Sequence, residues 1–205
     1  MEQCRDLDAG SEIHEKALFL AAEEGQEAIL RKLLDSGVNV NARDEWGSTA
    51  LDFAVSVGHE ETVRTLLRNG AKVDSTDRYD DSALHWSVTK EEITRLLLEG
   101  GACVQAENDT GQTALCWTAQ GGTVPVARLL LEHNANINWQ DMKGSTALHK
   151  ASLRGSDSMV RMLLENGADV NLKEWTTGHH YMPPALEVMW KLSSYCPIES
   201  MVETS

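Results

Sequence analysis

Apolar and polar residues alternate along this chain in a pattern that returns at a nearly constant interval. Each copy contains an Ala-Leu pair, a later leucine doublet, and then a glycine or asparagine followed by Val or Ile. The leucines of the five Ala-Leu pairs are 33, 33, 31 and 33 residues apart. They are Leu18, Leu51, Leu84, Leu115 and Leu148, and the doublets are Leu33-Leu34, Leu66-Leu67, Leu97-Leu98, Leu130-Leu131 and Leu163-Leu164. Five copies in phase indicate a repeat protein.

Each copy predicts two short helices followed by a turn, as the second copy illustrates. Thr49 is a suitable N-cap, because its hydroxyl can accept a backbone N–H at the start of a helix over 50–57. Gly58 can adopt the left-handed conformation that ends this helix. Glu60 begins a second helix, where negative charge suits the helix dipole, and Gly70 ends it. A helix pair this short cannot bury its apolar side alone, so we expect the units to stack on one another.

The third copy is two residues shorter than most of the others. A deletion inside a helix would turn all later side chains by about 200°, given 3.6 residues per turn. Ile93, Leu97, Leu98 and Gly101 nevertheless keep their mutual spacing, whereas "SVGHEE" of the second copy has become "SVTKEE". The sequence therefore predicts that the loss lies in the turn between the two helices, which is tightened or distorted.

These features together resemble the ankyrin repeat. The matching segments are "DEWGSTAL", "SVGHEETV", "TALHKAS", "LLLEHNANIN" and "LLENGADVNLK". The departures are Ala in place of Pro in every copy, the missing Gly-His of the third copy, and Phe19, Asp52 and Cys116 where His is usual. The resemblance implies an all-α solenoid of stacked helix–turn–helix units with hairpin loops, and a protein that binds other proteins. The five expected repeats are residues 11–43, 44–76, 77–107, 108–140 and 141–173.

The two flanks of the repeats carry weaker signals. Residues 1–10 are predicted to form a disordered acidic tail, and residues 174–205 a degenerate C-terminal cap and tail. In the C-terminal flank, Pro183-Pro184 suits the start of a helix. Two interpretations stay open for this helix, because it either covers the exposed end of the stack or docks another protein.

Composition narrows the classes of function. The chain has 205 residues, a net charge of −14 and no basic run, so we do not expect it to bind nucleic acid. No apolar stretch approaches the roughly 20 residues that a membrane span needs, and the charged N-terminus differs from a secretory signal. The four cysteines, Cys4, Cys103, Cys116 and Cys196, form no CxxC pair. We therefore expect reduced thiols, no metal site, and an intracellular monomer in the cytoplasm, the nucleus or both.

The resemblance implies that the variable pair at each hairpin tip points into solvent and contacts the partner. These pairs are Glu45-Trp46, Arg78-Tyr79, Asp109-Thr110 and Met142-Lys143, with Glu12-Ile13 in the first repeat. We expect Trp46 and Tyr79 to be neighbours, and exposed aromatic residues of this kind are frequent hot spots of binding. The alternative is that a bulky residue at a tip only covers its hairpin.

A second candidate surface is one column of the first helices. It consists of Leu20, Phe53, Trp86, Trp117 and Lys150. One interpretation is that these side chains pack between neighbouring repeats. The other is that Phe53, Trp86 and Trp117 line an apolar strip on the concave face.

The remaining polar columns have simpler interpretations. Every repeat has an arginine in its second helix, and four of the five have an acid four residues later, which balances the charge locally. The arginines are Arg31, Arg64, Arg95, Arg128 and Arg161, and the acids are Asp35, Glu99, Glu132 and Glu165. By the resemblance, His85 and His149 hydrogen-bond the backbone of the turn. Asn41, Asn138 and Asn171 stand where some ankyrin proteins are hydroxylated.

The sequence contains no nucleophile–base pair, no Gly-rich phosphate loop and no GxSxG motif. We therefore interpret the chain as a non-catalytic protein–protein interaction module that needs no cofactor. An acidic concave face favours a partner with a basic or neutral patch, and the residues that carry this charge are Glu12, Glu23, Glu24, Glu45 and Asp109. The alternative is a regulatory or substrate-recruiting subunit of an enzyme complex, such as an inhibitor or a ubiquitin-ligase-type adaptor.

Overall fold

The structure is a computed structural model that describes residues 3–175, and this part contains ten α-helices and no strand. In chain order the helices are α1 (Gln3–Glu23), α2 (Glu27–Asp35), α3 (Ala50–Val57), α4 (Glu60–Arg68), α5 (Ala83–Trp86), α6 (Glu91–Glu99), α7 (Ala114–Gly121), α8 (Val124–Glu132), α9 (Ala147–Arg154) and α10 (Asp157–Glu165). Each of the five repeats thus holds one pair of helices, and the predicted all-α solenoid is confirmed.

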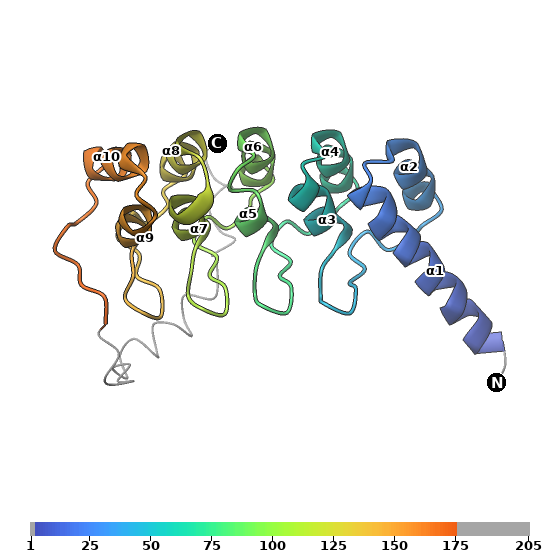
Figure 1. The fold of residues 1–205 in the computed structure, drawn as a ribbon. Coiled ribbons are helices and arrows are strands. Elements are labelled where there is room, and N and C mark those ends of the chain that lie inside the picture. The colour runs from blue at the N-terminus through green and yellow to red at the C-terminus, as the bar shows by residue number, and fades with distance from the viewer. Residues whose placement is uncertain (1–2, 176–205) are drawn as a thin grey trace, which may run out of the picture. The chain divides into compact units, whose positions relative to one another are not determined.

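The helix pairs stand side by side in two rows (Figure 1). The second helices α2, α4, α6, α8 and α10 form the outer row, and each packs against the next. The first helices form the inner row, in which α1, α3, α5, α7 and α9 pack in the same order. The hairpin loops between repeats all project on the side of the inner row. Every internal repeat is therefore covered by a neighbour on both sides.

The repeating leucines form one continuous core between the two rows. Leu51, Leu84 and Leu115 of the inner helices are almost fully buried, and so are Leu66 and Leu97 of the outer helices. Burial of one such side chain stabilises the fold by about 2 kcal/mol. Small residues such as alanine lie between the leucines and let adjacent helices approach closely. The leucine period of the sequence is therefore the period of the core.

The second repeat shows why the helices begin and end where they do. The Thr49 hydroxyl accepts a hydrogen bond from the Asp52 amide, and the Asp52 carboxylate accepts one from the Thr49 amide, which forms a reciprocal capping box. Gly58 ends α3 with a φ of 107°, in the left-handed region that favours glycine. The predicted helix over 50–57 and its Thr49 cap are confirmed.

One column of side chains joins each repeat to the next through the backbone. A side-chain oxygen of one repeat accepts a hydrogen bond from a backbone amide of the following repeat. The pairs are Asn41 with Lys72 (2.7 Å), Asp74 with Cys103 (2.8 Å), Gln105 with Asn136 (3.0 Å) and Asn138 with Asp169 (2.8 Å). These bonds give Asn41 and Asn138 a structural role, and hydroxylation of either residue stays a prediction.

The shortened third repeat keeps its second helix intact and loses part of its first. The helix α6 has nine residues, like the other outer helices, which confirms that the deletion precedes it. The inner helix α5 has only four residues, whereas α3, α7 and α9 have eight. Ser87 and Thr94, both buried, close the short turn through a 2.9 Å hydrogen bond between their hydroxyls. The deletion therefore removes the last turn of α5 as well as tightening the connection.

The N-terminal segment differs from its prediction. Residues 3–10 were expected to be disordered and Glu12-Ile13 to form a hairpin tip, but all of them lie within the 21-residue helix α1. Both expectations were wrong, because α1 continues through the place where later repeats have a hairpin (Figure 1). The predicted cap helix after Pro183-Pro184 lies outside the described residues.

Candidate functional site

Each hairpin loop is shaped by the side chain of its first residue. In the second repeat, Asp44 Oδ1 accepts hydrogen bonds from the backbone amides of Trp46 and Ser48, both at 2.8 Å. The same pair of bonds is made by Asp77, Asn108 and Asp141 in the later repeats. This Asx arrangement fixes the backbone so that the two variable residues stand at the tip.

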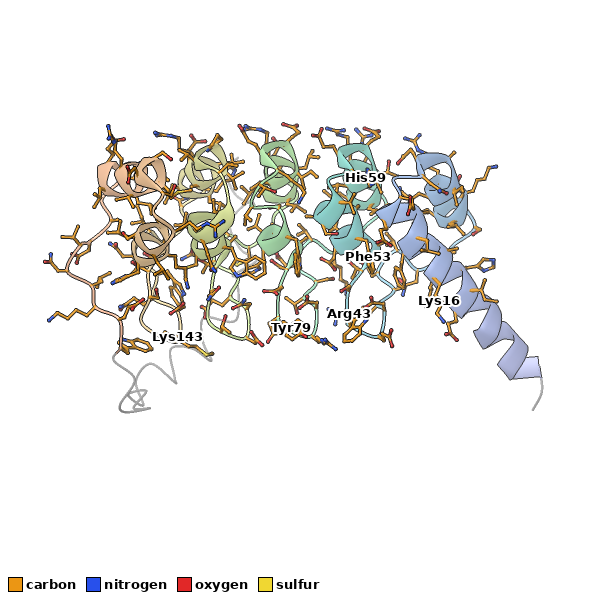
Figure 2. All side chains as sticks on the ribbon, viewed as in Figure 1. Lys16, Arg43, Phe53, His59, Tyr79 and Lys143 are labelled. Atoms are coloured by element: carbon orange, nitrogen blue, oxygen red, sulfur yellow. The ribbon has the colours of Figure 1, made fainter. Side chains whose placement is uncertain are left out.

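The tips are also bonded to one another through the main chain. The Arg78 amide donates to the Trp46 carbonyl at 2.9 Å, the Asp109 amide to the Tyr79 carbonyl at 2.9 Å, and the Met142 amide to the Thr110 carbonyl at 3.1 Å. Neighbouring loops are thereby held at fixed positions in a single row. The labelled tip side chains Tyr79 and Lys143 project from this row of loops (Figure 2).

Three side chains form a compact cluster on the first two tips. The Arg78 guanidinium lies over the Trp46 ring, with its Cζ 3.5 Å from the ring centroid, and 4.7 Å from the centroid of the Tyr79 ring. Arg78 also donates a hydrogen bond to the Tyr79 hydroxyl at 2.6 Å. Trp46 and Tyr79 each keep 46% of their surface exposed. Trp46 and Tyr79 thus lie close together, as expected, and Arg78 is the residue that links them.

Acidic side chains surround this cluster. Glu45, Asp80 and Asp109 are exposed on the tips, and Arg78 forms no ion pair with any described residue. The buried Asp81 carboxylate accepts a 2.9 Å hydrogen bond from the Asn108 amide. Burial, which outweighs this bond, raises the pKa of Asp81 to about 6. The Arg78 charge therefore stands in a field of net negative charge.

The other predicted tip residues are exposed but form no such cluster. Thr110 donates to its own loop, through a 2.7 Å hydrogen bond from its hydroxyl to Asn108 Oδ1. Met142 and Lys143 are exposed at the last tip. In Figure 2 Lys143 and Tyr79 lie on the same edge of the molecule, at different hairpins. The predicted tip residues of repeats two to five therefore share one edge of the inner row.

The inner-helix column is divided between packing and exposure. Phe53 is half-buried, and its ring centroid is 5.8 Å from that of Phe19. Trp117 is half-buried and meets Trp86 edge to face at 5.4 Å. Leu20 and Trp86 are exposed. Phe53 and Trp117 therefore pack between neighbouring repeats. Leu20 and Trp86 keep enough exposed surface to contact a partner.

Lys150, the last member of the column, is held by a carboxylate. Its Nζ lies 2.8 Å from Asp141 Oδ2, and both side chains are largely buried. The same aspartate orders the hairpin of the fifth repeat through its other oxygen. This ion pair connects the last tip to α9, so Lys150 is a structural residue rather than a free charge.

The arginine column of the outer helices is partly balanced, but by other residues than those predicted. Arg31 pairs with Glu27 at 2.6 Å and Arg64 with Glu61 at 2.8 Å, so the acids lie before the arginines in the sequence. Arg95 likewise contacts Glu91 at 3.3 Å. The predicted pairs with the following acids, Asp35, Glu99, Glu132 and Glu165, are not formed among the described residues.

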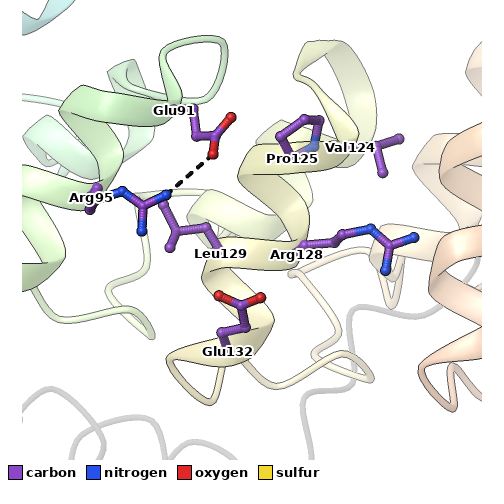
Figure 3. Close-up of a pocket in the computed structure, with 7 residues that line it drawn as sticks. All are labelled: Glu91, Arg95, Val124, Pro125, Arg128, Leu129 and Glu132. Carbon is purple, nitrogen blue, oxygen red and sulfur yellow. Dashed lines mark hydrogen bonds and ion pairs between the residues drawn. The ribbon is translucent and has the colours of Figure 1, made fainter.

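A cavity of about 240 Å³ lies between α6 and α8 (Figure 3). Its walls are Glu91, Arg95, Val124, Pro125, Arg128, Leu129 and Glu132. Two arginines and two glutamates leave it without net charge, and Arg95 is already bonded to Glu91. It holds none of the residues predicted for partner binding.

The histidines take structural roles. The Ser82 amide donates to His85 Nδ1 at 3.1 Å, and His85 Nε2 pairs with the Gln112 carbonyl of the next repeat at 3.0 Å. Burial lowers the pKa of His85, so the ring is neutral at pH 7. His149 accepts the corresponding bond from the Thr146 amide at 3.2 Å. The expected contacts of both histidines with the turn backbone are confirmed.

The cysteines follow the sequence prediction only in part. Cys116 is a free, buried thiol whose pKa is raised by burial. Cys103 is disulfide-bonded, so the expectation of reduced thiols was wrong at this position. Among residues 12–175, no group of three or more His, Cys, Asp or Glu side chains is placed to hold a metal ion. Nor does this part of the chain contain a helix long and apolar enough to cross a membrane.

Stacked helix pairs with a row of bonded hairpin tips define a repeat protein of the solenoid class. The sequence matches the family model described as ankyrin repeats (3 copies) over residues 18–108 and again over residues 84–174. These matches cover more than half of the chain, which therefore belongs to the ankyrin-repeat family. No curated protein matches the chain. Ankyrin repeats are generally modules for binding other proteins and are typically non-catalytic.

Proposed function

We propose that this protein is a non-catalytic interaction module that binds a partner protein through its hairpin tips and the adjoining inner-helix surface. The observation that carries the proposal is the cluster of Trp46, Arg78 and Tyr79. These are the three residue types most enriched at binding hot spots. Here all three are exposed, Arg78 contacts both rings, and the loops that carry them are bonded to one another.

The mechanism is the presentation of a surface that is ordered before the partner arrives. Binding normally costs about 0.5–1.5 kcal/mol for each flexible side chain that becomes fixed. Arg78 is already held between two rings and a hydroxyl, and the loop backbone is already hydrogen-bonded. Less conformational entropy is therefore lost on docking, and the exposed Trp86 extends the apolar contact onto the inner helices.

The surrounding acids determine the kind of partner surface that fits. Glu45, Asp80 and Asp109 favour a basic or neutral patch on the partner, which raises the association rate at low salt.

We also propose that the protein is a monomer and acts inside the cell, in the cytoplasm, the nucleus or both. Membership of the ankyrin-repeat family supports this location, whereas the disulfide at Cys103 is more typical of an oxidising compartment.

The test is affinity capture with the wild-type chain and with Trp46→Ala/Tyr79→Ala, followed by quantitative mass spectrometry. A hot-spot residue contributes about 2 kcal/mol or more, which corresponds to roughly 30-fold in affinity. We expect the partner to be retained by the wild type and lost from the double variant. Arg78→Ala should have an intermediate effect. Both aromatic rings remain, but they lose the guanidinium that holds them together.

The matched control is Ile29→Ala on α2, a residue with similar exposure, 47%, that is far from the tips. It should capture the partner as the wild type does. Circular dichroism and thermal unfolding would verify that all variants keep the helical fold. Equal capture by the wild type and the double variant would exclude the tip cluster from the interface.

A further inference from the structure

The helix α1 carries an exposed apolar side that the fold does not use. Ile13 and Leu20 are 67% and 60% exposed, although both are large and aliphatic. They are seven residues apart, which places them on one side of the helix and about 10 Å from each other along its axis. Leu18, Ala21 and Ala22 lie on the opposite side and are buried in the core. The contact of α1 with the stack is therefore made by other residues, and neither Ile13 nor Leu20 belongs to the core.

This apolar side is also where α1 departs from the other first helices. Repeats two to five reach their inner helix through a hairpin loop, whereas α1 continues as a helix beyond that point (Figure 1). The first repeat therefore presents a helical surface where the others present a loop tip. The charge of Glu45 on the first tip acts on Lys16 of α1: the pKa of Lys16 is raised mainly by its hydrogen bond to Glu12 and, to a smaller extent, by Glu45.

The rim of this surface is negatively charged. Lys16 and Glu12 neutralise each other in an ion pair of 2.7 Å. Glu23, Glu24 and Glu45 are exposed and form no ion pair with any described residue. Two of these acids follow Leu20 within the next turn of the chain. A pair of aliphatic side chains is thus bordered by carboxylates that lack a cation.

We propose that this side of α1 binds an amphipathic helix of a partner protein, with aliphatic residues facing Ile13 and Leu20 and Lys or Arg along its edges. Apolar residues seven apart on a straight helix match the i, i+3, i+4, i+7 pattern of a second helix. The backbone of α1 is hydrogen-bonded within the helix, so it offers no edge to an extended strand. The uncompensated carboxylates select the basic edges by charge complementarity. This surface adjoins the Trp46 cluster at Glu45 but uses different apolar residues, and its binding of a helix lies beyond the function proposed above.

The probe is a designed 18-residue helix-forming peptide with leucines on one side and lysines along both edges, titrated against the full chain by calorimetry. Ile13→Gln/Leu20→Gln should weaken binding at least tenfold, because it removes the apolar contact. Glutamine keeps the helix and leaves the net charge unchanged, so no other property of the surface is altered. Leu153→Gln on α9, the matched control at 92% exposure, should bind as the wild type does. Trp46→Ala/Tyr79→Ala should also bind normally, so the two proposals can fail independently. A peptide with glutamates in place of the lysines should bind at least tenfold more weakly.

Equal binding of the basic peptide to the wild type and to Ile13→Gln/Leu20→Gln would overturn the proposal, because it would show charge attraction without the apolar contact. Sedimentation velocity and methyl NMR of the free chain test the other occupants. A dimer that Ile13→Gln/Leu20→Gln dissociates would assign the surface to a second copy of the chain. Contacts of the Ile13 methyl group with residues 176–205 would assign it to the chain's own C-terminal part. Either result would overturn the proposal.

Discussion

Among single residues, Asp52 stands in an environment that opposes its charge. It occupies the position of His85 and His149, and it accepts hydrogen bonds from the Thr49 amide and hydroxyl through Oδ2, at 2.7 and 2.8 Å. Its other oxygen, Oδ1, is buried without a hydrogen-bond partner. Burial raises the pKa of Asp52 to about 6, against the lowering effect of the Thr49 bonds.

The substitution Asp52→His is expected to stabilise the protein at pH 7.5 and to destabilise it at pH 4.5. The folded pKa of Asp52 lies above its ordinary value of 3.8, so the wild type loses stability as the pH rises from about 4 to about 6. By pH 7.5 this amounts to about 1–3 kcal/mol. A histidine of the His85 type stays neutral there and can donate to the Asp81 carbonyl, which corresponds to Gln112 in the next repeat. Urea unfolding at both pH values measures the change.

The reversed exchange is the control for that prediction. His85→Asp should place a carboxylate in a site that is fully buried, and it should therefore destabilise the protein most at pH 7.5 and least near pH 4.5. If Asp52→His lowers stability at pH 7.5, the buried charge of Asp52 does not limit the stability of the second repeat.

Residue-level chemistry could be predicted from the sequence where it depends on near neighbours. The caps Thr49 and Gly58 and the neighbouring positions of Trp46 and Tyr79 follow from the local pattern and the repeat period. The role of Arg78 could not be predicted, because its side chain crosses to the ring of the preceding repeat. Asp80 was also missed: it takes the place of the tip glycine, with a φ of 59°, and aspartate tolerates this left-handed conformation better than most residues.

At the scale of elements, the short helix α5 and its neighbour α7 are fitted to each other. A Cβ on Gly122 would lie only 2.5 Å from the carbonyl oxygen of Val88, which is in the turn that follows α5. Thr118 Cα lies 2.8 Å from the same point. The Thr123 amide donates to this Val88 carbonyl at 3.3 Å. Gly122 thus allows the third and fourth repeats to approach closely at the shortened turn.

The substitution Gly122→Ala should destabilise the protein by about 2 kcal/mol or more, because the obstructing atoms belong to the backbone and cannot rotate away. Gly121→Ala is the matched control one residue earlier. Nothing lies within 4 Å of a Cβ at Gly121, and the residue ends α7, so alanine should be neutral or stabilise by up to about 1 kcal/mol. Thermal unfolding of both variants checks the difference. Equal stability of the two would mean that the turn of the third repeat is not in tight contact with Gly122.

The element that the sequence analysis assigned wrongly was the first one. Each hairpin loop begins with Asp or Asn, has a turn-forming residue at its fourth position, and leads to the N-cap of the inner helix. In the first repeat these positions are Ser11, His14 and Lys16. The loop and cap signals are absent, so a helix can continue toward the N-terminus. The signal was present in the sequence, but the repeat period concealed it, because the leucines remain in phase. The missing Gly-His of the third repeat located the deletion between its two helices, but the loss of the last turn of α5 could not be predicted, because it depends on how that turn packs.

For the molecule as a whole, the stack makes the stability of each repeat depend on its neighbours. The fourth repeat is covered on both sides, and Leu115 and Ala127 are fully buried in it. Their counterparts in the fifth repeat, Leu148 and Val160, are half-buried. Leu164 and Val170 are exposed on the same repeat. The described part of the chain therefore ends in a repeat that lacks part of the contact that the internal repeats have.

We expect amide hydrogen exchange to be faster in α9 and α10 than in α7 and α8. Opening the last repeat breaks one interface, whereas opening the fourth breaks two, and a difference of about 1.4 kcal/mol already gives tenfold faster exchange. Leu130 and Leu163 are an informative pair, because both side chains are fully buried and both lie in the same position of their outer helices. Exchange measured by NMR or mass spectrometry should show Leu163 at least tenfold less protected. Equal protection would contradict fraying at this end and would support the prediction that residues 174–205 cap the stack.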